Sequence, residues 1–252
     1  MPKTILITGA TAGIGKATAY RFARENYRLI LTGRRKELLT AIASELQQRY
    51  LVEIRALSFD IRKKDEVEQN LESLDGEWRN IDILVNNAGL AAGLDPVNEA
   101  STDDWDTMID TNVKGLLYIS RKVMPWMIGQ GSGHIFNIGS IAGKEVYPKG
   151  SVYAATKHAV DALTKGMRID LLPYGIRVTQ ISPGAVETEF SNVRFKGDAE
   201  RASMVYKGYE PLQGEDIAEI IHFIVNLPDR VNVNDILVMP RAQANVTTFH
   251  KI

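Results

Sequence analysis

The amino-acid sequence predicts an α/β protein in which a parallel sheet carries helices on both faces. Short apolar runs alternate with longer segments whose apolar residues recur at helical spacing, an order typical of β-α-β units. The runs are apolar at consecutive positions, as strands of a sheet covered on both sides require. A glycine-rich turn follows the first run, at the place where such folds bind phosphate groups.

The elements follow in order along the chain. Strands are expected at Thr4–Thr8, Leu29–Thr32, Val52–Phe59, Ile81–Val85, His134–Ile138, Arg177–Ile181 and Ile236–Met239. Helical patterns lie near residues 14–25, 35–49, 63–74, 103–128, 151–173 and 214–226. No linker or repeat interrupts this alternation, so residues 1–252 are expected to form one domain. Two segments lack clear periodicity, and we expect a lid at about 184–212 and a C-terminal tail at about 240–252.

Composition and charge exclude several classes of protein. Among 252 residues, 30 Lys and Arg balance 31 Asp and Glu, which gives no electrostatic footprint for nucleic acid. The chain has no cysteine for a disulfide or thiolate site, and its four histidines show no metal-ligand spacing. No apolar run approaches the roughly 20 residues of a membrane span, and the first run is too short for a signal peptide. A cytoplasmic protein without a metal is therefore expected.

The turn after the first strand contains Gly9, Gly13 and Gly15. Backbone N–H groups and the positive end of the following helix would point at a phosphate here. The spacing matches neither the Walker A loop nor the G-x-G-x-x-G fingerprint, and a plain tight turn is the alternative. The position after the first strand of an alternating fold favours a dinucleotide.

The end of the second strand indicates which dinucleotide would bind. An acidic residue about 20 positions after the glycines would hold the ribose 2′-hydroxyl of NAD. That position is Gly33 instead, followed by Arg34 and Arg35. Guanidinium groups match a 2′-phosphate in shape and charge, whereas two solvated arginines would be unfavourable at the positive end of a helix without an anion. The sequence therefore predicts NADP(H).

A second group of polar residues lies in the middle of the chain. Tyr153 and Lys157 are one turn apart on the same helix face, although such a pair is also common by chance. Ser140 closes the fifth strand at a carboxyl end, where open α/β sheets bind ligands, and Asn112 lies in a helical pattern. Singly, each has a plain alternative as a core tyrosine, a surface lysine, a strand-end serine or a helix-interior asparagine.

Together, these motifs resemble those of the short-chain dehydrogenase/reductase family over essentially the whole chain. In chain order the motifs are Thr8-Gly-x3-Gly-Ile-Gly15, Asn86-Asn-Ala-Gly89, Asn112, Ser140, Tyr153-x3-Lys157 and Pro183-Gly184. The resemblance implies a Rossmann domain with strand order 3-2-1-4-5-6-7 and hydride transfer to or from a nicotinamide.

The resemblance also implies catalytic roles for Asn112, Ser140, Tyr153 and Lys157. Tyr153 is the implied acid or base, Ser140 would hold the substrate oxygen, and Asn112 would anchor a water of the proton relay. A free tyrosine titrates near pH 10, so we expect the Lys157 ammonium to lower the pKa of Tyr153. Lys157 is also implied to bind the nicotinamide ribose.

Cofactor contacts are implied in the same way. The pyrophosphate would lie against Gly9, Thr11, Ala12, Gly13, Ile14 and Gly15, and adenine against Asp60 and Ile61. The nicotinamide side would be lined by Asn87, Ala88, Gly89, Pro183, Gly184, Val186 and Thr188. Asp60 has a simpler alternative, since it could cap the following helix.

On the substrate side, the segment 184–197 with Tyr147 and Tyr206 resembles the NADP-dependent 3-hydroxy acid dehydrogenases. That resemblance implies serine, L-allo-threonine or 3-hydroxypropionate as substrate, oxidised at the β-hydroxyl. A lid over such a substrate should carry a cation for its carboxylate, and Arg194 is the candidate, with Lys196 behind it. A solvated loop arginine is the alternative. Ser140 and Tyr147 complete the expected substrate contacts.

Two further interpretations of function stay open from the sequence. One is a broad-specificity NADPH-dependent carbonyl reductase, since lid residues govern the choice of substrate and the fold does not. The other is a non-catalytic NADP(H)-sensing protein. The helices near 103–128 and 151–173 carry wide apolar stretches, which the resemblance assigns to a homotetramer, with a dimer as the smaller possibility. Over-apolar core helices would explain the same pattern.

Overall fold

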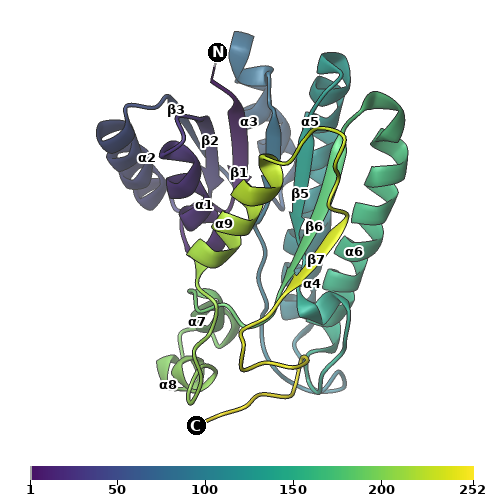
Figure 1. Ribbon diagram of the computed structural model, residues 1–252. Coiled ribbons are helices and arrows are strands. Elements are labelled where there is room, and N and C mark those ends of the chain that lie inside the picture. Colours follow the sequence, from purple (N-terminus) through teal and green to yellow (C-terminus); the bar gives the residue numbers. More distant parts are fainter. Residues whose placement is uncertain (1) are drawn as a thin grey trace.

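The computed structural model describes residues 2–252, which form a seven-stranded parallel sheet (Figure 1). The strands lie side by side in the order β3-β2-β1-β4-β5-β6-β7, which confirms the expected order. Their bounds are β1 Thr4–Thr8, β2 Arg28–Gly33, β3 Ile54–Ser58, β4 Ile83–Asn86, β5 His134–Ile138, β6 Arg177–Pro183 and β7 Asp235–Val238.

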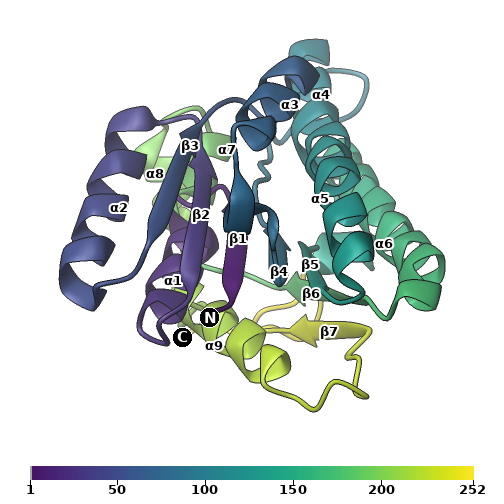
Figure 2. The ribbon, with the colours of Figure 1, turned by 90° about the horizontal axis from the view of Figure 1, so that it is seen from above.

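Helices cover both faces of the sheet, as Figure 2 shows from above. The first face is covered by α1 (Gly13–Ala23), α2 (Lys36–Tyr50) and α9 (Gly214–Val225). The second face is covered by α3 (Lys64–Glu72), α5 (Leu116–Gln130) and α6 (Ser151–Leu171), with α4 (Thr102–Ile109) at one end.

Consecutive apolar residues in a strand serve two different cores. Ile5 and Ile7 pack under the first face, whereas Leu6 between them packs under the second. Successive strand side chains point to opposite faces, so each central strand needs apolar residues throughout. The strands at the two edges of the sheet, β3 and β7, are partly exposed and follow this rule less closely.

The helical pattern near 103–128 is not one continuous α-helix. A π-helical turn from Asp110 to Gly115 separates α4 from α5, and it contains Asn112. Single π-turns of this kind occur frequently at functional sites because they change the direction in which backbone groups point.

The lid contains two short helices, α7 (Phe190–Arg194) and α8 (Ala199–Met204), beyond the carboxyl ends of the strands (Figure 1). The C-terminal tail crosses the same end of the molecule, where the Ile252 N–H donates a 2.8 Å hydrogen bond to the Gly208 carbonyl of the lid segment. None of the helices formed by residues 2–252 is long and apolar enough to cross a membrane.

Candidate functional site

A cavity of about 660 Å³ opens at the carboxyl ends of the strands, below the lid. Its size falls in the range of ligand pockets, and its position is the one at which open parallel sheets bind ligands. Every site residue expected from the sequence lines it except Gly15, Asn112 and Lys196, as far as residues 2–252 are concerned.

The glycine turn forms one end of the cavity. Gly13, the first residue of α1, has φ +50°, and a Cβ there would lie 2.8 Å from Cγ2 of Thr188. A Cβ on Gly15 would lie 2.4 Å from the Gly9 carbonyl oxygen, so Gly15 is needed for packing of the turn itself. Among the described residues no side chain caps α1, which leaves its first N–H groups available to an anion such as a pyrophosphate.

The two arginines after β2 differ in their contacts. Arg34 lines the cavity and has no hydrogen-bond or ion-pair partner within residues 2–252. Each nitrogen of the Arg35 guanidinium has a partner: Nη1 lies 2.7 Å from Oε2 of Glu189, and Nε and Nη2 donate to Oγ1 of Thr11 at 3.3 and 3.0 Å. A free guanidinium beside an uncapped turn fits a phosphate group.

Asp60 at the end of β3 lines the same part of the cavity with Ile61. The helix α3 begins at Lys64 with Lys63 in the N-cap position, so the alternative of Asp60 as its cap is wrong. The Asp60 carboxylate instead accepts hydrogen bonds from the backbone and guanidinium of Arg62. Burial alone would raise the pKa of Asp60, but these bonds hold it below its ordinary value.

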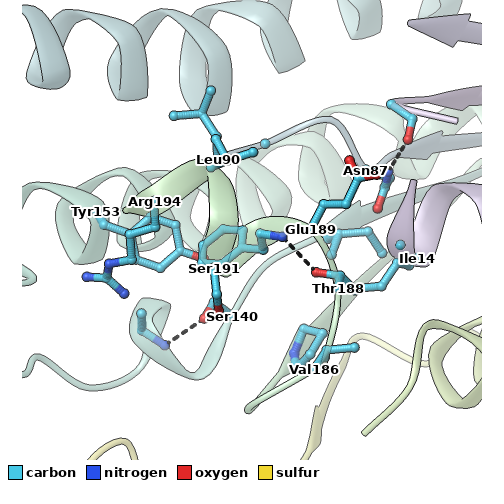
Figure 3. Close-up of a pocket in the computed structure, with 18 of the residues that line it drawn as sticks. Ile14, Asn87, Leu90, Ser140, Tyr153, Val186, Thr188, Glu189, Ser191 and Arg194 are labelled. Carbon is cyan, nitrogen blue, oxygen red and sulfur yellow. Dashed lines mark hydrogen bonds between the residues drawn. The ribbon is translucent and has the colours of Figure 1, made fainter. Parts of the chain in front are cut away.

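The loop after β4 is fastened to the glycine turn (Figure 3). The Asn87 amide donates to the Thr8 and Gly9 carbonyls at 2.9 and 3.2 Å. The Thr8 hydroxyl accepts from the backbone N–H groups of Asn87 and Ala88, both at 3.0 Å. Thr8 was part of the motif but was not expected to act in the site; its hydroxyl fixes the wall that Ala88 and Gly89 form.

The Asn112 side chain lies behind this wall. Its Oδ1 accepts from the Leu90 N–H at 2.8 Å, and its Nδ2 donates to the Leu90 carbonyl at 2.8 Å and to the Thr156 hydroxyl at 3.0 Å. The amide thus clamps the loop after β4 to α6. Both hydrogens of Nδ2 and one lone pair of Oδ1 therefore have protein partners.

Ser140, Tyr153 and Lys157 come together at the centre of the cavity, and the two helical residues are buried. The Ser140 hydroxyl accepts from the Ala142 N–H at 3.0 Å at the start of a short 3₁₀ turn. The Lys157 Nζ donates to the Ile138 carbonyl at 2.8 Å and lies 6.0 Å from the centre of the Tyr153 ring.

Burial controls the acid–base properties of this group. It lowers the pKa of Lys157 to about 8, because the charged ammonium is removed from water. It raises the pKa of Tyr153 above the ordinary value, as does Tyr147, while Ser140 and Arg194 pull that pKa down. The expectation that Lys157 gives Tyr153 a lowered pKa is therefore wrong for the protein alone, since the loss of hydration outweighs the Ser140 hydrogen bond and the Arg194 charge, the two contributions that lower this pKa.

Arg194, at the end of α7, points into the same cavity, close to Tyr153 (Figure 3). Its Nη2 donates to the Tyr147 hydroxyl at 2.8 Å, and its guanidinium carbon lies 5.9 Å from the centre of the Tyr153 ring. Lys196 does not line the cavity and is instead paired with Asp104 at 2.9 Å. The structure thus brings Arg194, but not Lys196, to the tyrosine.

Several cavity residues could not be anticipated from the sequence. Glu189 and Phe190 come from the lid, and Gln243, Val246 and Phe249 come from the tail. The Gln243 Oε1 accepts from the Ala185 N–H at 2.8 Å, across 58 residues of chain. Such contacts depend on tertiary position and leave no local pattern.

Within residues 2–252 no group of three or more His, Asp or Glu side chains is placed so that it could hold a metal ion.

Known proteins resemble this chain in sequence and in structure. The family model described as short chain dehydrogenase matches residues 3–199. The NADP-dependent 3-hydroxy acid dehydrogenase YdfG of Salmonella typhi is 47% identical over 241 residues, covering 95% of this chain and 96% of the relative. Sulfoacetaldehyde reductase 2 of Chromohalobacter salexigens is 45% identical over 245 residues, covering 97% and 96%.

Among solved structures, the closed form of serine dehydrogenase complexed with NADP+ superposes with a TM-score of 0.92 at 45% identity, covering 99% of this chain and 100% of that one. These matches extend over nearly the whole sequence and confirm the resemblance that the motifs indicated. The chain belongs to the short-chain dehydrogenase/reductase family of oxidoreductases.

Proposed function

We propose that this protein is an NADP-dependent oxidoreductase that acts on the β-hydroxyl of short 3-hydroxy acids, such as serine, L-allo-threonine or 3-hydroxypropionate. The observation that carries the proposal is the Arg194 guanidinium, held by Tyr147 at 5.9 Å from the Tyr153 ring. In a 3-hydroxy acid one carbon separates the carboxylate from the carbon that bears the hydroxyl. Such a molecule can reach the guanidinium and the phenol together.

The residues that line the cavity fit NADP(H). Arg34 would bind the 2′-phosphate, Asp60 and Ile61 would contact adenine, and the turn from Gly9 to Gly15 would cradle the pyrophosphate. Lys157 would bind the nicotinamide ribose, with Asn87, Ala88, Gly89, Pro183, Gly184, Val186 and Thr188 around the nicotinamide. The cofactor supplies the hydride in reduction and accepts it in oxidation.

In the proposed chemistry, the chain's own groups move the proton. The Ser140 hydroxyl holds the substrate oxygen, and Tyr153 gives a proton to the developing alkoxide in reduction or takes one from the hydroxyl in oxidation. The raised pKa of Tyr153 keeps the phenol protonated at neutral pH, ready to donate. Asn112 joins the loop after β4 to α6, the helix that carries Tyr153 and Lys157.

Reduction of a short aldehyde that carries a sulfonate is a second candidate. A guanidinium pairs with a sulfonate as readily as with a carboxylate, so Arg194 does not separate the two. The 45% identity to a sulfoacetaldehyde reductase supports this candidate independently. It is a specific form of the carbonyl reductase that the sequence left open.

A substrate panel tests these proposals. Purified protein is assayed by the absorbance of the reduced nicotinamide with serine, allo-threonine, 3-hydroxypropionate, sulfoacetaldehyde and uncharged alcohols of the same length. We expect kcat/KM to be highest for the acids. Equal turnover of uncharged alcohols would contradict recognition by Arg194, and tight NADPH binding without any turnover would indicate a sensor.

We also propose that the protein acts in the cytoplasm as one domain per chain within a homotetramer. Exposed apolar side chains support an interface, among them Ile169 and Leu172 at the end of α6 and Phe223 on α9. Light scattering on the purified protein gives the mass of the assembly, and a monomer at micromolar concentration would contradict the proposal.

A further inference from the structure

Arg35 connects two walls of the cavity that are far apart in sequence. Its guanidinium contacts Thr11 in the glycine turn on one side and Glu189 at the start of the lid on the other. The contact with Glu189 spans 154 residues of the chain. All three nitrogen atoms of this guanidinium therefore have protein partners already.

Arg34, the neighbouring residue, differs from Arg35 in its side-chain contacts. It lines the same cavity at the same end of β2, but has no side-chain partner within residues 2–252. A 2′-phosphate could bind to Arg34 without meeting another anion, whereas a phosphate at Arg35 would lie beside the Glu189 carboxylate that already neutralises that guanidinium. The sequence could not separate the two arginines, but their contacts do.

The lid touches the glycine turn at a second point beside this ion pair. Thr188 precedes Glu189 and lies directly over Gly13, where a Cβ would approach it to 2.8 Å. Thr188 and Ile14 lie next to each other in Figure 3. The start of the lid is therefore fixed to the turn by packing and by charge together.

Glu189 also begins the helix that ends in Arg194. It is the N-cap residue of α7, and its carbonyl accepts from the Val193 N–H at 3.0 Å. The helix α7 has only five residues, so a contact that fixes Glu189 at its start also sets the position of Arg194 at its end. The cofactor end and the substrate end of the cavity are thus joined through one rigid segment.

We propose that Arg35 and Glu189 form a latch that closes the lid over the dinucleotide and positions α7, and that Arg34 alone of the two arginines binds the 2′-phosphate. The latch is the Thr11–Arg35–Glu189 set of contacts. This inference rests on the proposed dinucleotide binding but not on the identity of the substrate. Arg35 and Glu189 are positioning residues, because they act through the lid.

The latch predicts effects that do not depend on the phosphate. Both side chains are about half exposed, 43% for Arg35 and 51% for Glu189, so the ion pair is weak and screened by salt. Glu189→Gln should weaken the binding of NADPH and of NADH by the same factor, about two- to fivefold. Its dissociation rate for both cofactors should rise, and its KM for acidic substrates should rise as α7 loosens.

Binding is measured by the fluorescence of the reduced nicotinamide, at equilibrium and by stopped flow, without any substrate. Arg35→Gln should reproduce the effect of Glu189→Gln, and the double variant should be no weaker than either single one. Arg34→Gln is the matched control, which should weaken NADPH binding alone. The charge exchange of Arg35→Glu with Glu189→Arg should recover part of the affinity, and thermal melting checks that each variant is folded.

The opposite results would overturn the latch. Tighter binding of NADPH to Glu189→Gln would mean that Glu189 competes with the phosphate for Arg35. A loss in Arg35→Gln that is confined to NADPH would make Arg35 a phosphate ligand, and additive losses in the double variant would mean that the two residues act separately. Failure of the wild-type protein to bind either cofactor would instead contradict the proposed function itself.

Discussion

Arg194 of the lid donates a 2.8 Å hydrogen bond from Nη2 to the hydroxyl of Tyr147, which follows the strand-end Ser140 by seven residues. Its Nε also donates to the Gly93 carbonyl at 3.2 Å. The guanidinium is therefore held from two sides while it faces the cavity. A charged group that is already fixed loses little conformational freedom when it binds an anion.

Removal of this charge should damage the use of acidic substrates selectively. Arg194→Ala is expected to lower kcat/KM for 3-hydroxy acids about 10- to 100-fold, the usual effect of losing a charge-assisted hydrogen bond. Turnover of an uncharged alcohol of the same length should change much less. Lys196→Ala is the control, because Lys196 pairs with Asp104 outside the cavity. Equal losses on both substrates would refute a contact between Arg194 and the carboxylate.

Loss of the Tyr153 hydroxyl should stop the chemistry but not cofactor binding. Tyr153→Phe keeps the buried ring, which packs against Phe190 with ring centres 5.6 Å apart, and removes the proton donor. We expect kcat to fall about 10²- to 10⁴-fold, as for the loss of a general acid. Tyr206→Phe serves as the comparison, since that hydroxyl binds Ser191 and the Val186 carbonyl rather than the centre of the site. An active Tyr153→Phe enzyme would remove the proposed role.

Lys157 should reduce the stability of the folded protein, because its ammonium loses hydration when it is buried. At pH 7 the ammonium is charged in both the folded and the unfolded protein, since burial lowers the folded pKa only to about 8 from an ordinary value of 10.5. Lys157→Met removes this penalty but also loses the bond to the Ile138 carbonyl. The net expectation is a free energy of unfolding about 1–3 kcal/mol higher at pH 7, measured by urea denaturation.

The lowered pKa of Lys157 also determines how the difference in the free energy of unfolding between Lys157→Met and wild type depends on pH. Between pH 8 and 10.5 the unfolded chain holds the proton more tightly than the folded protein, so wild-type stability rises through this window relative to the variant. The advantage of Lys157→Met should therefore shrink over that range. Lys165→Met, an exposed position on the same helix, should show little change at pH 7. A constant difference between Lys157→Met and wild type from pH 7 to 10.5 would mean that the ammonium is not desolvated.

The sheet could be predicted from the sequence because its strands are buried on both faces. Ile5, Leu6 and Ile7 must all be apolar because neighbouring residues in the strand pack into different cores. The result is a run of consecutive apolar residues, which indicates a buried strand. The bounds of an edge strand were predicted less accurately: a strand was expected over Val52–Phe59, whereas β3 spans only Ile54–Ser58 and is partly exposed.

The π-turn and the lid show where local pattern fails. Helical periodicity near 103–128 cannot reveal the π-turn, because the contacts of Asn112 with Leu90 and Thr156 are tertiary. The lid helices α7 and α8 are too short to show a period. Residues that belong to a motif, such as Ser140, could be placed in the cavity from the sequence. Glu189 could not, because it reaches the cavity only when the lid packs against the glycine turn.

The tail should limit the size of the substrate. Phe249 lines the cavity and packs on Tyr209 of the lid segment with ring centres 4.9 Å apart, and Lys251 lies 5.7 Å from the centre of the same tyrosine ring. Phe249→Ala removes an apolar wall without touching Ser140 or Tyr153. We expect kcat/KM to rise for 3-hydroxy acids with longer alkyl chains and to fall modestly for the shortest ones, because the lid loses a contact.

A series of 3-hydroxy acids of increasing chain length measures this effect. In the wild-type enzyme kcat/KM should decline steeply with length, and in Phe249→Ala the decline should be shallower. Leu51→Ala is the control, since Leu51 is exposed at the end of α2 and does not line the cavity within the described residues. If Phe249→Ala lowered kcat/KM for every length by the same factor, the tail would support the lid without shaping the pocket, because loss of a size-limiting wall must change the ratio between substrates.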